Sequence, residues 1–224
     1  EALAAEAAAA AAEAEAEAAG CAAVASSDDQ LIFLGTGSAI PSKYRNVSGI
    51  LLHLRGGGGG GGGVILDAGE GTLGSLRRRF GEEYAARVVS ELDLVWISHM
   101  HADHHLGLLS LLQARRVGAS TRRGGGDGGD GGDGGGEVAE GRPLLLVAPM
   151  AMRAWLREAA SSLDGVGAYR FVHCGAAPRD AAVAAALRRA GLSSLATARV
   201  VHCSDAWAVA LQHPQGWGVV YSGD

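Results

Sequence analysis

A dense group of histidines with one aspartate follows a strongly apolar run at residues 92–97. His99, His101 and His104 fall within six positions, together with Asp103. In an extended turn, His99 and His101 point the same way and can share one metal ion, which leaves Asp103 and His104 to hold a second. Imidazole and carboxylate together form a ligand set that Zn²⁺ accepts well. A solvated histidine-rich loop is the alternative, and the buried strand predicted directly before the group argues against it.

Two further candidate ligands lie far downstream, each directly after an apolar run. His202 follows residues 200–201, and Asp224 follows residues 219–223. A lone histidine is more often structural, and an aspartate after glycine more often ends a strand at a turn, so neither residue is informative alone. Together with the histidine group, however, they place metal-binding residue types after three separate predicted strands, and this combination indicates a shared metal site. Asp224 is then a candidate carboxylate bridge between two metal ions about 3.5–4 Å apart.

The hydrophobic pattern around these residues predicts strands that alternate with helices. Apolar positions at helical spacing predict helices over residues 72–89, 106–116 and 150–163. Short apolar runs predict strands at residues 31–34, 50–54, 64–66, 92–97, 144–147, 200–203, 207–211 and 217–221. This alternation, with polar clusters at the strand ends, indicates an α/β layered fold.

The composition separates one predicted domain from low-complexity segments. Residues 1–28 are almost entirely Ala and Glu, which predicts a spacer or tail because no stripe of large side chains is available for docking. The domain is expected over residues 29–224, interrupted by Gly-rich loops at 56–63 and 124–136. The second loop carries GGD repeats that could indicate Ca²⁺ binding, although a flexible, solvated loop is the simpler interpretation.

The chain has 224 residues and a formal net charge of −5, which argues mildly against a stand-alone nucleic-acid-binding protein. Its three cysteines, Cys21, Cys174 and Cys203, show no pairing pattern and suit a reducing compartment. No apolar run is long enough to span a bilayer, and we expect no membrane partner. The arginines at 77–79 and 115–116 could contact phosphate, but a solvated helix face is the simpler expectation.

The string from His99 to His104 resembles the HxHxDH signature of metallo-β-lactamase-fold enzymes, which is specific for that superfamily but not for a substrate. The flanking segments narrow the resemblance to the catalytic half of long-form tRNase Z. They are the opening segment with its PxKxRN loop at 34–48, the LDxGEGT-like element at 66–72, His202-Cys203 with Ala206-Trp207, and the stretch at 221–224. The similarity extends from about Leu31 to the last residue.

This resemblance implies a metallo-β-lactamase αββα sandwich and a zinc-dependent endoribonuclease that removes 3′ trailers from precursor tRNA. The enzyme would hold two zinc ions. The implied metal ligands are His99, His101 and His202 for one ion, Asp103 and His104 for the other, and Asp224 as the bridge between them.

The resemblance also implies roles around the metal ions. Asp103 would act as the catalytic residue that orients or deprotonates the attacking water, and Asp67 would brace the metal loop through hydrogen bonds. A strand-ending turn at residues 67–69 is a compatible, structural interpretation of Asp67. The PxKxRN loop would lie near the cleaved end of the substrate. Its residues here are Pro41, Lys43, Arg45 and Asn46.

The sequence departs from the family pattern after Asp224. The family continues with a His near a Glu that assists protonation, and with a final His that completes the second metal site. We therefore expect a C-terminally truncated chain that is weakly active or inactive and that exposes sheet edges. The arm that grips tRNA would belong to an N-terminal half or to a second subunit.

Other interpretations stay open at the level of sequence. A hydrolase of a small ester, thioester or sulfate with the same fold is the alternative function. A non-catalytic half of tRNase Z is a third hypothesis, and the retained ligands from His99 to His202 count against it. The resemblance predicts a nuclear, mitochondrial or plastid location.

Overall fold

The computed structural model describes residues 29–54, 62–121, 143–166 and 169–224. The expected Ala/Glu tail and the second Gly-rich loop lie outside these residues, as does most of the first loop. Gly62 and Gly63, which we expected in the first loop, belong instead to a strand and pair with Leu54 and His53. Backbone pairing to a long neighbouring strand extends the ladder regardless of side-chain type, which the composition could not indicate.

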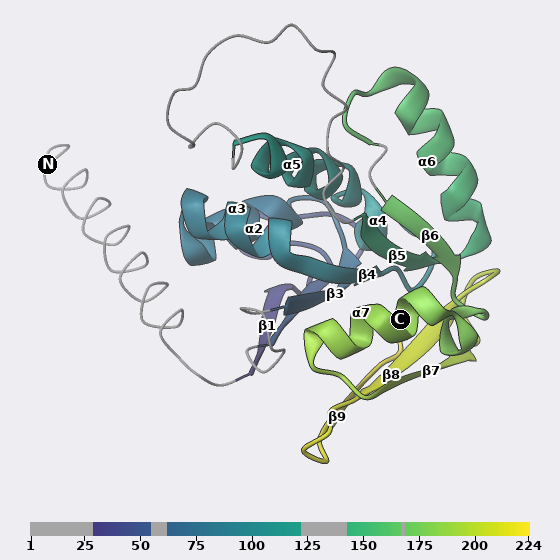
Figure 1. Cartoon of the computed structure of the whole chain (residues 1–224). Helices are drawn as coiled ribbons and strands as arrows, with labels where there is room; N and C mark the ends of the chain where they lie inside the picture. The colour runs from purple at the N-terminus through teal and green to yellow at the C-terminus, as the bar shows by residue number, and fades with distance from the viewer. Residues whose placement is uncertain (1–28, 55–61, 122–142, 167–168) are drawn as a thin grey trace, which may run out of the picture.

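The first layer is a six-stranded sheet in the order β1-β2-β3-β4-β5-β6 (Figure 1). The strands β1, β2 and β3 pair antiparallel, and β3 to β6 pair parallel. Their bounds are Gln30–Gly35, Gly49–Leu54, Gly62–Ala68, Leu92–Trp96, Leu144–Ala148 and Tyr169–His173. The sequence pattern did not predict β6, in which Arg170 and His173 interrupt a short apolar run. Pairing with β5 decides its conformation.

The central strands of this sheet are buried on both faces, since successive side chains along each strand point to opposite sides and both sides are covered. Leu51, Ile65 and Val95 face a cluster formed with the helices on one side, whereas Leu66 and Trp96 face the second cluster. The helices of the first side are α2 (Thr72–Phe80), α3 (Glu82–Glu91), α5 (Leu108–Thr121) and α6 (Met150–Ser162). Within the described part of the chain, none of the helices has the length and apolar character that crossing a bilayer requires.

The opposite side of the sheet is covered by one helix and a second sheet (Figure 1). This helix is α7 (Ala181–Ala190), and the second sheet has the antiparallel order β7-β8-β9. The strands are Ser194–Arg199, Trp207–Gln212 and Gly218–Tyr221. Val183 and Leu187 of α7 join Val209 and Leu211 of β8 in one buried cluster. The helix–sheet–sheet layering agrees with the predicted sandwich.

Two predicted elements were wrong in detail. The single helix expected over 72–89 is broken into α2 and α3 at Gly81, whose φ of 76° and ψ of 163° are not helical. The apolar spacing continues across this break because both helices pack on the same face of the sheet. The strand expected at 200–203 is a turn, and β7 ends before it at Arg199.

The loops that follow β3 and β4 touch backbone to backbone through two glycines. A Cβ atom on Gly69 would lie 2.1 Å from the carbonyl oxygen of Asp103 and 2.5 Å from a methyl group of Val47. A Cβ atom on Gly107 would lie 2.1 Å from the carbonyl oxygen of Gly69. Only glycine permits this approach, which brings the end of β3 against the loop that carries His99 and His101.

We therefore expect Gly69→Ala to lower the free energy of unfolding by roughly 3 kcal/mol or more, because backbone atoms cannot yield as a flexible side chain can. Urea unfolding followed by circular dichroism measures the change. Gly74→Ala is the matched control, since its new Cβ atom would meet only the guanidinium of Arg78 at 3.3 Å, in the middle of α2. That control is expected to be neutral or to stabilise by about 0.5–1 kcal/mol. Equal midpoints for the two variants would contradict the close contact.

Candidate metal centre

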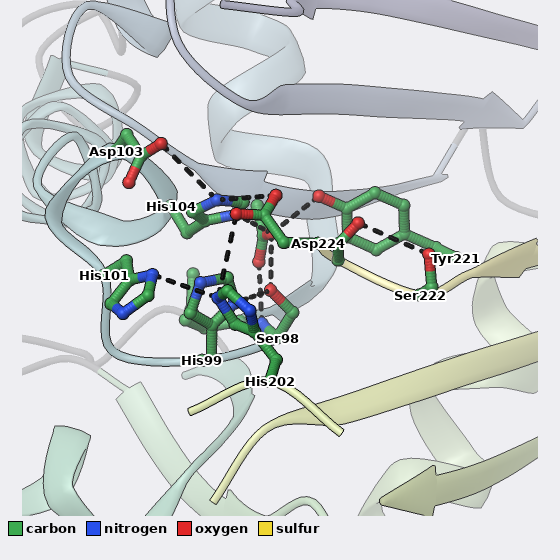
Figure 2. Close-up of polar contacts among 12 residues, drawn as sticks. Ser98, His99, His101, Asp103, His104, His202, Tyr221, Ser222 and Asp224 are labelled. Atoms are coloured by element: carbon green, nitrogen blue, oxygen red, sulfur yellow. Dashed lines mark hydrogen bonds and ion pairs between the residues drawn. The ribbon is translucent and has the colours of Figure 1, made fainter. Parts of the chain in front are cut away.

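Four chain segments deliver polar side chains to one end of the two sheets (Figure 2). The parallel strands β3 and β4 end side by side, which places Asp67 next to the loop that starts at Ser98. The short helix α4 (Ala102–His105) follows, with His101 at its N-cap. The turn between β7 and β8 carries His202, and Asp224 follows β9. Strands from both sheets are therefore needed to assemble the group.

The first candidate ligand group contains His99, His101 and His202. One ligand atom from each of these residues and from Cys203 lies within 4.8 Å of all the others. Nδ1 of His101 lies 3.1 Å from Nε2 of His202, and the ring of His99 meets both rings edge-on. This geometry brings together the three histidines that the sequence assigned to one metal ion.

The second candidate group contains His99, His104 and Asp224, again within 4.8 Å of one another. Oδ1 of Asp224 lies 3.3 Å from Nε2 of His104, and its Oδ2 lies 3.8 Å from Nε2 of His202. The carboxylate therefore presents one oxygen to each group. Asp103 lies outside this mutual set, although its Oδ2 is 3.6 Å from Nε2 of His104.

The donor set fits a bound cation. The Nε2 atoms of His99 and His104 are buried and have no hydrogen-bond partner among the described residues. Such orphaned acceptors or donors are costly inside a protein unless something binds them. Imidazole nitrogens and carboxylate oxygens at this spacing suit Zn²⁺. The two groups therefore form a candidate metal site.

Asp67 orients the buried imidazoles of His99 and His104 through hydrogen bonds on their Nδ1 side, directly to His104 and through Ser98 to His99. Its carboxylate is fully buried and accepts hydrogen bonds from the backbone N–H and the hydroxyl of Ser98, each at 2.7 Å. The same Oδ2 atom accepts from Nδ1 of His104 at 2.6 Å and from the hydroxyl of Tyr221 at 2.7 Å. Because the Ser98 hydroxyl donates to Asp67, its oxygen is left to accept from Nδ1 of His99, 2.9 Å away. Both histidines thus carry their proton on Nδ1 and turn an Nε2 lone pair toward the metal groups.

The charges around the site favour a cation. Burial, followed by the neighbouring His104, lowers the pKa of His99 to about 4, so this imidazole is neutral at pH 7. Burial opposes protonation of His104, but the hydrogen bond to Asp67 and the charges of Asp67 and Asp224 outweigh it and raise its pKa. Burial also raises the pKa of Tyr221, and the Asp67 carboxylate adds to this effect, so the phenol stays a donor. The carboxylates of Asp67 and Asp224 therefore favour positive charge next to His104.

The loop at residues 38–46 contacts Asp103, which lies beside the second ligand group. The backbone N–H of Ala39 donates to Oδ2 of Asp103 at 2.7 Å. Burial favours protonation of Asp103, but this hydrogen bond and the nearby His104 prevail and lower its pKa. The four substrate-loop residues predicted from sequence lie on this loop, away from the ligand groups. They are Pro41, Lys43 and Arg45, which are exposed, and Asn46, which is half-buried.

Solved structures with similar architecture identify the fold. The crystal structure of a long form RNase Z from yeast matches with a TM-score of 0.68 at 23% identity, over 87% of this chain and 29% of that one. The same fold occurs in a further match that is described as a metallo-β-lactamase fold protein. This chain has the metallo-β-lactamase fold. Its two ligand groups lie where the loops of both sheets of that fold converge.

The chain is also similar in sequence to curated proteins. Zinc phosphodiesterase ELAC protein 2 of Macaca fascicularis is 37% identical over 206 residues, which cover 87% of this chain and 22% of that protein. The mitochondrial ribonuclease Z of Drosophila melanogaster is 33% identical over 206 residues, covering 89% and 24%. A family model described as anti-Pycsar protein Apyc1 matches residues 29–123. The chain is thus similar to ribonuclease Z and spans less than a quarter of the length of these curated relatives.

Sequence reasoning missed several residues of the metal centre. Cys203 joins the first group because residues 200–205 form a turn, whereas the predicted strand would have pointed His202 and Cys203 to opposite faces. Ser98 and Tyr221 belong to the hydrogen-bond network of Asp67. Ser98 stands directly before the first histidine, and that adjacency is the one signal that could have identified it.

Asp205 holds the turn that carries His202. Its Oδ2 accepts from the backbone N–H of Met150 at 2.9 Å, and its Oδ1 accepts from Nε1 of Trp207 at 2.7 Å. Nε2 of His173 lies 3.5 Å from the same Oδ1 atom. The residue has a positive φ of 61°, so the turn depends on these bonds to keep a strained backbone in place.

We expect Asp205→Asn to weaken zinc binding about tenfold, since asparagine tolerates positive φ but turns an NH₂ group toward the N–H of Met150. Competition with a chromophoric chelator measures the zinc affinity. Asp180→Asn is the matched control, because Asp180 caps α7 by accepting from the N–H groups of Ala182 and Val183, away from the ligand groups. Asparagine caps helices well, and the control should bind zinc as the unchanged chain does. Equal zinc affinity in both variants would show that Asp205 does not position His202.

Proposed function

We propose that this chain forms the catalytic centre of a zinc-dependent endoribonuclease that removes 3′ trailers from precursor tRNA. One observation carries the proposal: two ligand groups lie next to each other, and Asp224 presents one carboxylate oxygen toward each group. This is the arrangement that two-metal phosphodiester hydrolysis needs. Similarity to proteins named zinc phosphodiesterase and ribonuclease Z supports the same reaction class.

Two zinc ions are the proposed cofactor. His99, His101 and His202 would hold one ion, with Cys203 at the edge of that group. His104 and Asp103 would hold the other, and Asp224 would bridge the two. When bound, the two ions lower the pKa of water to near neutrality and stabilise charge that develops on the phosphate.

The protein groups would then direct the hydrolysis. Asp103 is held by the N–H of Ala39 with its carboxylate in the charged form, and we propose that it orients the attacking water and accepts its proton. The bond that breaks joins the phosphorus to the 3′ oxygen of the tRNA, which leaves with a 3′-hydroxyl, and the phosphate stays on the trailer. Asp67 contributes indirectly, because it orients the imidazoles of His99 and His104.

The substrate contacts are proposed for the loop at residues 38–46. Pro41, Lys43, Arg45 and Asn46 would lie along the RNA near the cleaved bond, because the same loop touches Asp103 through Ala39. The overall charge of −5 makes a grip on the tRNA body by this chain alone unfavourable. An N-terminal half or a second subunit would supply that grip. We further infer a nuclear or organellar location, which the mitochondrial relative supports.

Zinc content and tRNA cleavage test the proposal together. Elemental analysis of the chain is expected to give two zinc ions, and a 3′-extended precursor tRNA is expected to be cut once, after the discriminator base. Dialysis against a chelator should abolish the cleavage, and added zinc should restore it. Bound zinc together with hydrolysis of a small ester and an intact precursor tRNA would contradict the proposed substrate.

A further inference from the structure

A hollow of about 640 Å³ opens beside the loop at residues 38–46. Its wall combines this loop with strand β1 and helix α2, three segments that are separated in sequence. The lining residues used below are Lys43, Tyr44, Arg45, Ser75, Arg78 and Arg79. None of them belongs to the ligand groups.

Four cationic side chains line this hollow, although the chain as a whole is acidic. Lys43 and Arg45 come from the loop, whereas Arg78 and Arg79 come from the last turn of α2. Within the described residues, no carboxylate forms an ion pair with any of these four side chains. Such a concentration of uncompensated charge attracts anions.

Hydrogen bonds hold the helix and the loop together at this hollow. The guanidinium of Arg78 donates to the hydroxyl of Ser75 at 3.0 Å, and the amide of Asn46 donates to the same oxygen at 3.3 Å. A second contact from the loop, the N–H of Ala39 to Asp103, reaches the metal groups. One loop therefore connects the hollow to the side of the metal centre where Asp103 lies.

An aromatic ring accompanies the charges. Tyr44 is 85% exposed, and Nζ of Lys43 lies 5.4 Å from the centre of its ring. A large exposed aromatic ring among cations is the combination by which proteins bind single-stranded nucleic acid, with bases stacked on the ring and phosphates bound by the cations. An acidic peptide would use the cations but would gain less from an exposed ring.

We propose that this hollow binds the single-stranded RNA next to the cleaved bond. Arg78 and Arg79 bind backbone phosphates, and Tyr44 stacks on a base. The proposal rests on the proposed function, which it extends by two arginines on α2 and one aromatic ring. It assigns the sequence Arg78-Arg79 to substrate binding.

Binding of a fluorescein-labelled single-stranded RNA to the full chain, measured by fluorescence anisotropy over a salt series, tests this assignment. We expect the double variant Arg78→Gln, Arg79→Gln to bind at least about tenfold more weakly at low salt. The slope of log affinity against log salt should fall by about 1.4, since each phosphate contact on a single strand contributes about 0.7. Tyr44→Ala should weaken binding roughly 5- to 100-fold with an unchanged salt slope.

Arg77→Gln is the matched control. Arg77 lies on the same turn of α2, but its guanidinium pairs with Glu82 at 2.9 Å and does not line the hollow. This variant should bind RNA as the unchanged chain does. Circular dichroism and zinc content, measured on all variants, separate loss of RNA contacts from loss of structure.

The outcomes distinguish this site from the proposed function. If the double variant and the control bind RNA equally, with equal salt slopes, the hollow is not an RNA site, whatever the chain cleaves. Competition by inorganic phosphate or by an acidic peptide that matches competition by unlabelled RNA also overturns the assignment. If the double variant alone loses RNA affinity while the unchanged chain leaves precursor tRNA intact, the RNA site stands and the proposed tRNA cleavage fails.

Discussion

Replacement of His99 by alanine is expected to remove the zinc ion proposed for His99, His101 and His202 and to lower cleavage by at least about 10³-fold. His99 is the one residue that the two groups have in common among the described residues. Its side chain is 1% exposed, and its Nε2 atom has no other partner there. Because Nδ1 of His99 bonds to Ser98, its Nε2 lone pair can bind one metal ion, and loss of the imidazole removes one of the three histidines proposed for that ion. Elemental analysis and cleavage of precursor tRNA measure the two effects.

His105→Leu provides the control for this prediction. His105 is buried in the same short helix, but its ring packs edge-on against Trp155 of α6 and takes no part in either ligand group. We expect this variant to retain its zinc, even if packing costs some stability. A His99→Ala variant that keeps two zinc ions would show that His99 is not a zinc ligand.

Replacement of Asp67 by alanine is expected to destabilise the fold by about 3–5 kcal/mol and to weaken zinc binding by roughly 10- to 100-fold. The carboxylate accepts four hydrogen bonds, and each buried donor left without a partner costs about 1–3 kcal/mol. The second effect follows because Asp67 orients the Nε2 atoms of His99 and His104. Urea unfolding with zinc and with a chelator separates the two effects.

Tyr221→Phe is the graded control for Asp67. It removes one of the four hydrogen bonds while Ser98 and His104 keep theirs, so we expect a loss of about 1 kcal/mol and nearly unchanged zinc affinity. Zinc adds stability that grows with the logarithm of its affinity for the folded chain, so the gap between the two unfolding curves reports that affinity. If the gap were the same for Asp67→Ala as for the unchanged chain, Asp67 would not orient the ligands.

The sequence by itself predicted most of the first layer and the candidate ligands. The strands at 50–54 and 144–147 are present because their apolar runs fit strands that are buried on both faces, whereas the strand at 31–34 forms the partly exposed edge of the sheet. The segment from His99 to His104 carries its ligand types within a few residues, so local spacing could indicate a metal site. The resemblance placed Asp67 behind the metal loop, and the structure puts its carboxylate against Ser98 and His104.

Only the tertiary structure decided how distant segments meet. Asp224 and His104 lie 120 positions apart, and their approach to 3.3 Å follows from the packing of the second sheet on the first. The break at Gly81 escaped the helical pattern, because both helices bury the same face. The sequence also could not predict the hollow that Arg78 and Tyr44 line together, since charge pairing depends on neighbours in space. Periodicity reports which side of an element is buried, whereas the partner of each side chain is set by long-range packing.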